Sequence, residues 1–261
     1  MNGPTVDFGK CRWAAGGSDI GQERPDNEDA WLCDHGRGLF VVADGMGGHA
    51  AGEQASAIAI RVLHEELSCE KLTAAVAEGE EAMKALFYTA LTAADAAILH
   101  ATEEHPKWKG MGTTAVIAYL DGNRLYIANV GDSRAYLLRG SRPTLLTQDH
   151  SIAGMLVQEG VITPDAVREH PHRNELTMTL GIAQELDPAF AVHELQSGDR
   201  LLLCTDGLWD MLDEHDIAQI VHFSATPHEA VYALIAAADD EGGYDNITVV
   251  VFFYRPDRTA E

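Results

Sequence analysis

The sequence contains little cysteine. Its 261 residues include only four, at positions 11, 33, 69 and 204. None of them forms a C-x-x-C pair, and their spacing fits no zinc site. Sparse, unpaired cysteine is typical of a reducing compartment, so a framework of disulfides is excluded as the basis of the fold.

Long apolar runs are also missing. Residues 1–10 lack the apolar segment of a secretory signal. The longest apolar runs, such as residues 249–254, have the length of a strand and are too short to cross a bilayer. We therefore expect a cytoplasmic protein that has no membrane partner.

Positive charge is scarce. The chain has 18 Lys and Arg against 41 Asp and Glu, a formal net charge of −23. A field of this sign repels nucleic acid and anionic lipid, which excludes both as expected partners. Two interpretations remain: the acidic residues maintain solubility, or some of them gather a cation.

No stretch rich in Pro, Gly or Ser divides the chain, and no repeat of solenoid length is present. We expect one domain over residues 1–261. The patterns predict strands over residues 38–43, 113–120, 125–130, 135–138, 200–204 and 247–254, and helices over 50–67, 73–100, 213–223 and 228–238. Residues 149–173 are expected to form short helices and loops. Runs of strands and helices segregated in this order indicate an α+β fold, with antiparallel sheets covered by helices.

Acidic residues gather where predicted strands meet turns. The four clusters are residues 24–29 (RPDNED), Asp44-Gly45, Asp206-Gly207 and Asp245-Asn246. A strand end holds a side chain on a rigid base while the turn leaves it open to solvent. One Asp-Gly pair is most often only a turn, whereas four such clusters at strand boundaries favour a common site.

Oxygen donors of this kind suit Mg²⁺ or Mn²⁺. Converging carboxylates repel one another unless a counter-charge lies between them. Two divalent ions would remove that conflict, acidify a water molecule and stabilise in-line displacement at phosphorus. The glycines at 45–48 lack the Lys-Ser/Thr of a P-loop and do not fit G-x-G-x-x-G.

Eight segments in order resemble the metal-dependent protein phosphatases, the PPM or type 2C family, in their bacterial form. The segments are RPDNEDA (24–30), VVADGMGGHAAGEQAS (41–56), MGTTAVIA (111–118), NVGDSRAYLLR (129–139), LTQDHS (146–151), NELTMTLG (174–181), LLLCTDGLWDML (202–212) and YDNITVVVF (244–252). The resemblance implies a sandwich of two antiparallel β-sheets flanked by helices, with a dinuclear metal site at one end. It also implies a flap beside the site, at about residues 149–180.

The resemblance implies serine/threonine phosphatase activity on phosphorylated proteins through a metal-activated water, opposing a cognate Ser/Thr kinase. Two core Mn²⁺ or Mg²⁺ ions are implied, with a third, weaker ion. Asp44 would bind both core ions, and Arg24 would bind phosphate. The remaining implied ligands are Asp206 and Asp245 at one core ion, the Gly45 carbonyl with Glu28 or Asp29 at the other, and Asp132 with Asp206 at the third.

One position departs from the family. Some members carry a histidine directly after the metal-site Asp-Gly, where it is thought to protonate the leaving group, and here the residue is Met46. A metal-bound water or another histidine such as His49 would then supply the proton, or the alkoxide would leave with help from metal alone. For Asp132, support of the turn after Gly131 is an equal alternative to a metal role.

The same residues bear on other enzyme classes. A cysteine phosphatase is excluded because no cysteine has Arg six positions later. A phosphatase with an aspartyl nucleophile and a zinc hydrolase are not supported, because neither D-x-D-x-T nor H-E-x-x-H occurs. A hydrolase of small phosphoesters with the same centre remains the main alternative. A pseudophosphatase that acts as a binding protein should have lost a metal-site Asp, whereas this sequence retains Asp44, Asp206 and Asp245. A Ca²⁺-binding protein should carry a D-x-D-x-D-G loop, and the sequence has none.

Overall fold

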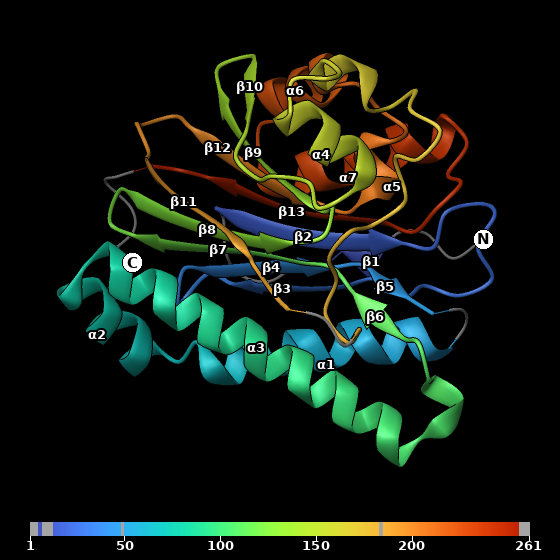
Figure 1. Cartoon of the computed structure of the whole chain (residues 1–261). Helices are drawn as coiled ribbons and strands as arrows, with labels where there is room; N and C mark the ends of the chain where they lie inside the picture. Colours follow the sequence, from blue (N-terminus) through green and yellow to red (C-terminus); the bar gives the residue numbers. More distant parts are fainter. Residues whose placement is uncertain (1–4, 7–12, 48–49, 183–184, 256–261) are drawn as a thin grey trace.

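The structure, a computed structural model, describes residues 5–6, 13–47, 50–182 and 185–255. Two antiparallel β-sheets stack face to face, and helices cover both outer faces (Figure 1). The predicted α+β sandwich is therefore confirmed. Cys11 and His49 lie outside the described residues.

The six-stranded sheet has the order β1-β2-β13-β12-β9-β10. Its strands are β1 (Thr5–Val6), β2 (Ala14–Asp19), β9 (Arg134–Arg139), β10 (Arg142–Leu145), β12 (Arg200–Cys204) and β13 (Ile247–Phe253). The helices on its outer face are α4 (Ile152–Gln158), α5 (Asp206–Trp209), α6 (Glu214–Phe223) and α7 (Pro227–Asp240). A short 3-10 turn, η2 (Pro164–Ala166), follows α4.

The five-stranded sheet has the order β11-β8-β7-β4-β3. Its strands are β3 (Ala30–Asp34), β4 (Leu39–Ala43), β7 (Ala115–Asp121), β8 (Arg124–Val130) and β11 (Ala189–Glu194). On the other side lie α1 (Ala50–Glu66), α2 (Cys69–Glu78) and α3 (Glu80–Glu104), with the 3-10 turn η1 (Pro106–Trp108). A small ribbon pairs β5 (Gly45–Met46) with β6 (Gly112–Thr113).

The continuous apolar strands are explained by burial on both faces. In β4, Leu39 and Val41 pack under the helices while Phe40 and Val42 pack between the sheets. Successive strand residues point to opposite faces, so a strand covered on both sides is apolar at every position. Such strands form a rigid base for the loops at their ends.

One predicted helix is wrong in extent. The expected helix over residues 73–100 is two helices, α2 and α3, which meet at Gly79. Gly79 has φ 106°, a left-handed conformation that favours glycine and cannot continue an α-helix. Helices α6 and α7 have side-chain N-caps: Asp213 accepts a hydrogen bond from the Asp216 N–H, and Thr226 accepts one from the Glu229 N–H.

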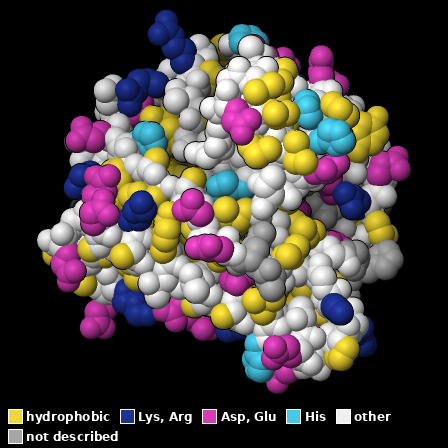
Figure 2. Space-filling view, viewed as in Figure 1, with side chains coloured by type: hydrophobic (Ala, Val, Ile, Leu, Met, Phe, Trp, Pro, Cys, Tyr) yellow, Lys and Arg dark blue, Asp and Glu magenta, His cyan; other side chains and the backbone are white. Residues whose placement is uncertain are grey.

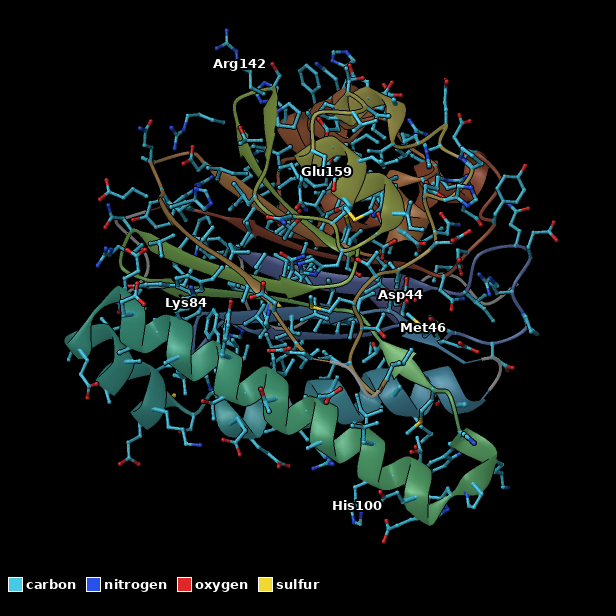
Figure 3. All side chains as sticks on the ribbon, in the orientation of Figure 1. Asp44, Met46, Lys84, His100, Arg142 and Glu159 are labelled. Atoms are coloured by element: carbon cyan, nitrogen blue, oxygen red, sulfur yellow. The ribbon has the colours of Figure 1, made fainter. Side chains whose placement is uncertain are left out.

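Helix α3 is long and apolar enough to cross a membrane by length and mean hydropathy alone. Its apolar residues are used within the fold, because Met83, Phe87, Leu91 and Ile98 are buried against the sheet. The exposed side of α3 points away from the sheets, as His100 shows in Figure 3. Packing in the core therefore accounts for the apolar character of α3.

Candidate metal centre

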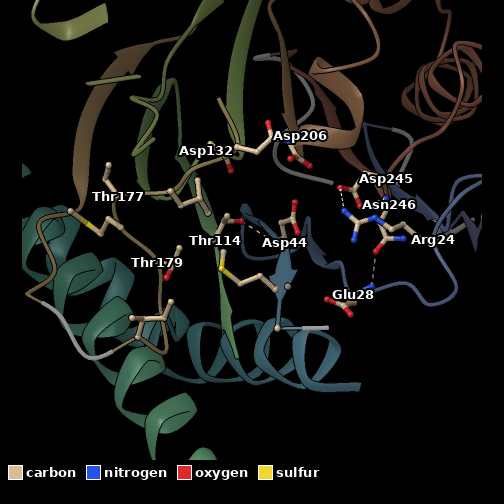
Figure 4. A pocket seen from close by; sticks show the side chains of 17 residues that line it. Arg24, Glu28, Asp44, Thr114, Asp132, Thr177, Thr179, Asp206, Asp245 and Asn246 are labelled. Atoms are coloured by element: carbon tan, nitrogen blue, oxygen red, sulfur yellow. Dashed lines mark hydrogen bonds and ion pairs between the residues drawn. The ribbon is translucent and has the colours of Figure 1, made fainter. Parts of the chain in front are cut away.

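All the predicted site residues except Asp29 line one pocket of about 460 Å³ at an end of the sandwich (Figure 4). Asp44 follows β4, Asp206 follows β12, and Asp245 precedes β13. Figure 4 shows these three carboxylates and that of Asp132 around one space. Four segments far apart in sequence thus bring their acidic side chains together. Figure 3 places Asp44 and Met46 at this end of the molecule, far from Arg142 at the tip of β10.

The backbone of Asp44 is held by two threonines. The Thr114 hydroxyl accepts a hydrogen bond from the Asp44 N–H at 2.9 Å. The Asp44 carbonyl accepts hydrogen bonds from the Thr113 hydroxyl at 2.8 Å and from the Thr114 N–H at 2.9 Å. With its backbone fixed, Asp44 presents its carboxylate to the pocket. Neither threonine was predicted from the sequence as a residue of the site.

The glycines after Asp44 and Asp206 are required by close packing. A Cβ on Gly45 would collide with the carbonyls of Glu28 and Gly52. A Cβ on Gly207 would collide with the Asn246 carbonyl. Each Asp-Gly pair therefore lets a neighbouring backbone segment approach the base of the pocket.

Glu28 and Asp29 occupy different places. Glu28 lines the pocket, and its N–H donates to the Asn246 side-chain oxygen at 2.8 Å. Asp29 lies behind the pocket wall, where one carboxylate oxygen accepts from the Thr205 hydroxyl at 2.9 Å. Its other oxygen is buried without a hydrogen-bond partner. Both residues remain candidates for the metal site, with Glu28 directly on the cavity.

Arg24 lies on the pocket wall and is paired with Asp245, with 2.5 Å between Nη2 and Oδ2. The sequence had assigned these two residues separate roles, as a phosphate-binding group and a metal ligand. The structure shows that the guanidinium also serves as a counter-charge to one of the carboxylates.

The electrostatics of the pocket are those of an anion cluster. Burial, followed by repulsion from Asp245, raises the pKa of Asp206 to about 6. Burial and neighbouring carboxylates also raise the pKa values of Asp29, Asp44 and Asp132 well above the ordinary range. These shifts show that ionising all four groups together is unfavourable without added positive charge.

The donor set fits divalent cations. The pocket offers carboxylates and backbone oxygen, which hard cations prefer. One oxygen of Asp206 is buried without a hydrogen-bond partner, as is one of Asp29. Buried polar atoms are normally satisfied, so these two orphaned oxygens suit ion coordination. Across the described residues, no three His, Cys, Asp or Glu side chains already form a ligand cluster.

Residues of the predicted flap complete the pocket. The flap side is lined by Asn174, Leu176, Thr177, Met178 and Thr179, with Ile182 just beyond the flap. The wall opposite the carboxylates is therefore partly apolar. Met46 also lines the cavity, and the described lining residues include no histidine.

The acidity of the chain is not confined to the pocket. Figure 2 shows Asp and Glu side chains scattered over the visible face rather than gathered in one patch. The two interpretations of the net charge thus apply together: most acidic residues are solvated, and a few converge on the pocket.

Comparison with known proteins gives consistent matches. Residues 16–240 match the family described as Protein phosphatase 2C. The chain is 38% identical over 234 residues to the serine/threonine protein phosphatase PstP of Mycobacterium tuberculosis, covering 90% of this chain and 43% of PstP. It therefore spans less than half the length of that relative. It is 37% identical over 237 residues to the serine/threonine phosphatase stp of Listeria monocytogenes, covering 90% and 92%.

A solved structure shares the fold. The catalytic domain of the serine/threonine protein phosphatase PstP, in complex with two manganese ions, matches with a TM-score of 0.78 and 36% identity. The match covers 93% of this chain and 98% of that chain.

Proposed function

Because this chain belongs to the protein phosphatase 2C family, we propose that it is a metal-dependent phosphatase that hydrolyses phosphoserine and phosphothreonine in proteins. The observation that carries the proposal is the pocket in which Asp44, Asp206 and Asp245 converge beside Arg24. The matched relatives are named as serine/threonine phosphatases and cover the same fold. The whole of residues 1–261 acts as one domain, with 149–180 as a flap.

Carboxylates from separate strand ends hold the ions. Asp44 lies centrally, since its charge interacts with those of Asp29, Asp132, Asp206 and Asp245. Asp206 and Asp245 would complete one core position, and the Gly45 carbonyl with Glu28 or Asp29 would complete the other. Asp132 with Asp206 would hold a third, weaker ion. Bound Mn²⁺ or Mg²⁺ would acidify water and neutralise phosphoryl oxygens.

Arg24 orients the substrate. Its planar guanidinium can bind two phosphate oxygens at once. In the structure Arg24 pairs with Asp245 and neutralises its charge. A metal ion bound to Asp245 would neutralise that charge instead. With a cation on Asp245, the Arg24 guanidinium would be free to bind phosphate. Met46 lines the pocket and cannot donate a proton, so the leaving oxygen would take its proton from water or another histidine, or would leave as the alkoxide with help from the ions alone.

The pocket is open enough for a phosphorylated side chain carried on a protein. The substrates are phosphoproteins made by a Ser/Thr kinase, and the enzyme works in the cytoplasm. Sparse cysteine agrees with that compartment.

The test is hydrolysis of an aryl phosphate and of a phosphothreonine peptide with and without Mn²⁺ or Mg²⁺. Turnover of both with added metal, lost in excess chelator, supports the proposal. Full activity in chelator would contradict the metal mechanism. Turnover of small phosphoesters without turnover of phosphopeptides would point to a small-molecule hydrolase.

A further inference from the structure

A buried arginine lies behind the pocket, between the flap and the turn that carries Asp132. Arg134 begins β9 and is 6% exposed. Its Nη2 lies 2.6 Å from Oδ2 of Asp149, and its Nε is 3.1 Å from both oxygens of that carboxylate. Its Nη1 donates to the Tyr136 hydroxyl at 3.0 Å. Each nitrogen of the guanidinium therefore has a hydrogen-bond partner.

The flat face of the same guanidinium rests on Trp209. Its central carbon lies 3.7 Å from the centroid of the Trp209 ring. The indole N–H of Trp209 donates to the Asp132 carbonyl at 3.1 Å. Trp209 belongs to α5, the helix that begins at Asp206. One aromatic ring thus connects the segments of two proposed metal ligands, and Arg134 holds that ring.

The partner of Arg134 stands at the root of the flap. Next to Asp149, the His150 N–H donates to the Gly131 carbonyl at 2.9 Å, and His150 Nδ1 accepts from the Gly131 N–H at 3.2 Å. The His150 carbonyl accepts from the N–H of Thr177, which lines the pocket. The flap root is therefore bonded both to the Asp132 turn and to the pocket-lining part of the flap.

We propose that Arg134 is a positioning residue that fixes Asp132 relative to Asp206 and to the flap, through its contacts with Trp209 and Asp149. Simple packing would not require it, because a buried ion pair is often no more stabilising than apolar residues of the same volume. Only a planar fork can bind a carboxylate along two edges and stack on indole at once. The proposal rests on the proposed function in one respect, the metal role of Asp132.

The experiment compares Arg134→Lys with Arg139→Lys. Arg139 lies on the same strand and also pairs bidentately with an aspartate, Asp199, with Nη2 to Oδ2 at 2.7 Å and Nε to Oδ1 at 2.9 Å. It belongs to the opposite end of β9 and is absent from the pocket lining that the structure describes. The two substitutions therefore remove the same kind of fork in different places.

Calorimetric titration with Mn²⁺ alone gives the first readout. In Arg134→Lys the weakest Mn²⁺ step should lose affinity by about tenfold, the lower end of what loss of a residue behind a ligand costs a metal site. The tighter steps should change little, and Arg139→Lys should match the parent protein. Equal weakening of every step would indicate general loosening and would overturn the proposal, as would an unchanged weakest step.

Trp209→Phe gives a second, milder variant that keeps an aromatic ring and removes the hydrogen bond to Asp132. It should weaken the same Mn²⁺ step. Combined with Arg134→Lys it should add little, because residues acting through one contact are not additive. Additive effects would contradict the route through Trp209. If the parent protein binds Mn²⁺ but hydrolyses no phosphopeptide, the proposed function fails while this test of Arg134 remains valid.

Discussion

The side chain of Asn246 holds the backbone of Glu28, 218 positions earlier in the chain, through a 2.8 Å hydrogen bond from the Glu28 N–H. Its amide nitrogen donates to the carbonyls of Ile20 and Asp26 at 2.9 and 3.0 Å. One side chain thus fixes the loop between β2 and β3, which carries Arg24 and Glu28, to the start of β13.

Asn246→Ala should therefore loosen both phosphate and metal positions. Each lost hydrogen bond should lower the free energy of unfolding by roughly 1 kcal/mol, and turnover should fall by about 10–100-fold. Denaturant unfolding and steady-state kinetics check both numbers. Asn123→Ala, at an exposed turn on the opposite end of the sandwich, is the control. Equal kinetics for the two variants would show that Asn246 does not position the loop.

Asp206→Asn should nearly abolish turnover while the fold survives. The amide is a poorer ligand and lacks the charge that balances the cation, so the transition state should lose several kcal/mol, on the order of one metal contact. In chelator the variant should melt no lower than the parent, because Asp206 is repelled by Asp245. Aryl phosphate turnover and thermal melting measure this. Near-normal turnover at saturating Mn²⁺ would mean that the core-site assignment is wrong.

Asp132→Asn should have a different effect. As the ligand of the weaker ion, Asp132 should mainly set the Mn²⁺ concentration needed for activity, with less effect on the two core ions. Metal titration of activity and calorimetric counting of bound Mn²⁺ give the contrast with Asp206→Asn. An unchanged metal requirement would favour the alternative in which Asp132 only supports its turn.

Gly45→Ala should damage the site through packing alone. The added Cβ would overlap the carbonyls of Glu28 and Gly52, and the strain should lower the free energy of unfolding by about 1–3 kcal/mol. Gly36→Ala is the matched control, since a Cβ there would meet only Asp34 Oδ1 at 3.6 Å. Thermal melting with and without Mn²⁺ tests the pair. A Gly45→Ala protein that melts and binds Mn²⁺ like Gly36→Ala would exclude close packing as the role of Gly45.

His150 should make the flap root sensitive to acid. Burial lowers its pKa from the ordinary 6.5, and the charges of Asp149 and Asp187 oppose that shift only in part. Folding therefore favours neutral His150, whose Nδ1 accepts the hydrogen bond from Gly131. This contribution to stability is complete above pH 6.5 and is lost as pH falls from 6.5 through the lower folded pKa.

The measurement is unfolding free energy against pH for the parent and His150→Gln, between about pH 5 and 7. The parent should lose more stability than the variant as the pH falls. Parallel curves would mean that protonation of His150 does not affect the fold.

Local sequence determined much of the scaffold. Short continuous apolar runs are enough to predict β4 and β12, and Asp213 and Thr226 act as helix caps through contacts with residues three positions away. The Asp-Gly pairs at strand ends also indicated which carboxylates would face a common pocket. These features depend on contacts between residues close together in the chain, so a local sequence pattern is enough to predict them.

Other elements depended on distant partners. Strand β2 was not predicted, because its glycines disfavour a strand; Gly16 lies there because a Cβ would collide with the Trp31 ring of β3. Strand β11, which forms by pairing with β8, was not predicted either. The single helix predicted over residues 73–100 was wrong for a local reason. The apolar residues follow a helical spacing across the whole segment, but Gly79 ends α2 and α3 begins after it.

The sequence by itself determined which residue types could bind metal and phosphate, because those follow from side-chain chemistry. The tertiary structure decided how these residues are held. Asn246 binds the backbone of Glu28, and Thr114 binds the backbone of Asp44. Arg134 stacks on the Trp209 ring, which in turn donates to the Asp132 carbonyl. These contacts join residues dozens to hundreds of positions apart. No local pattern encodes them, because they exist only once the two sheets have packed and brought the strand ends together.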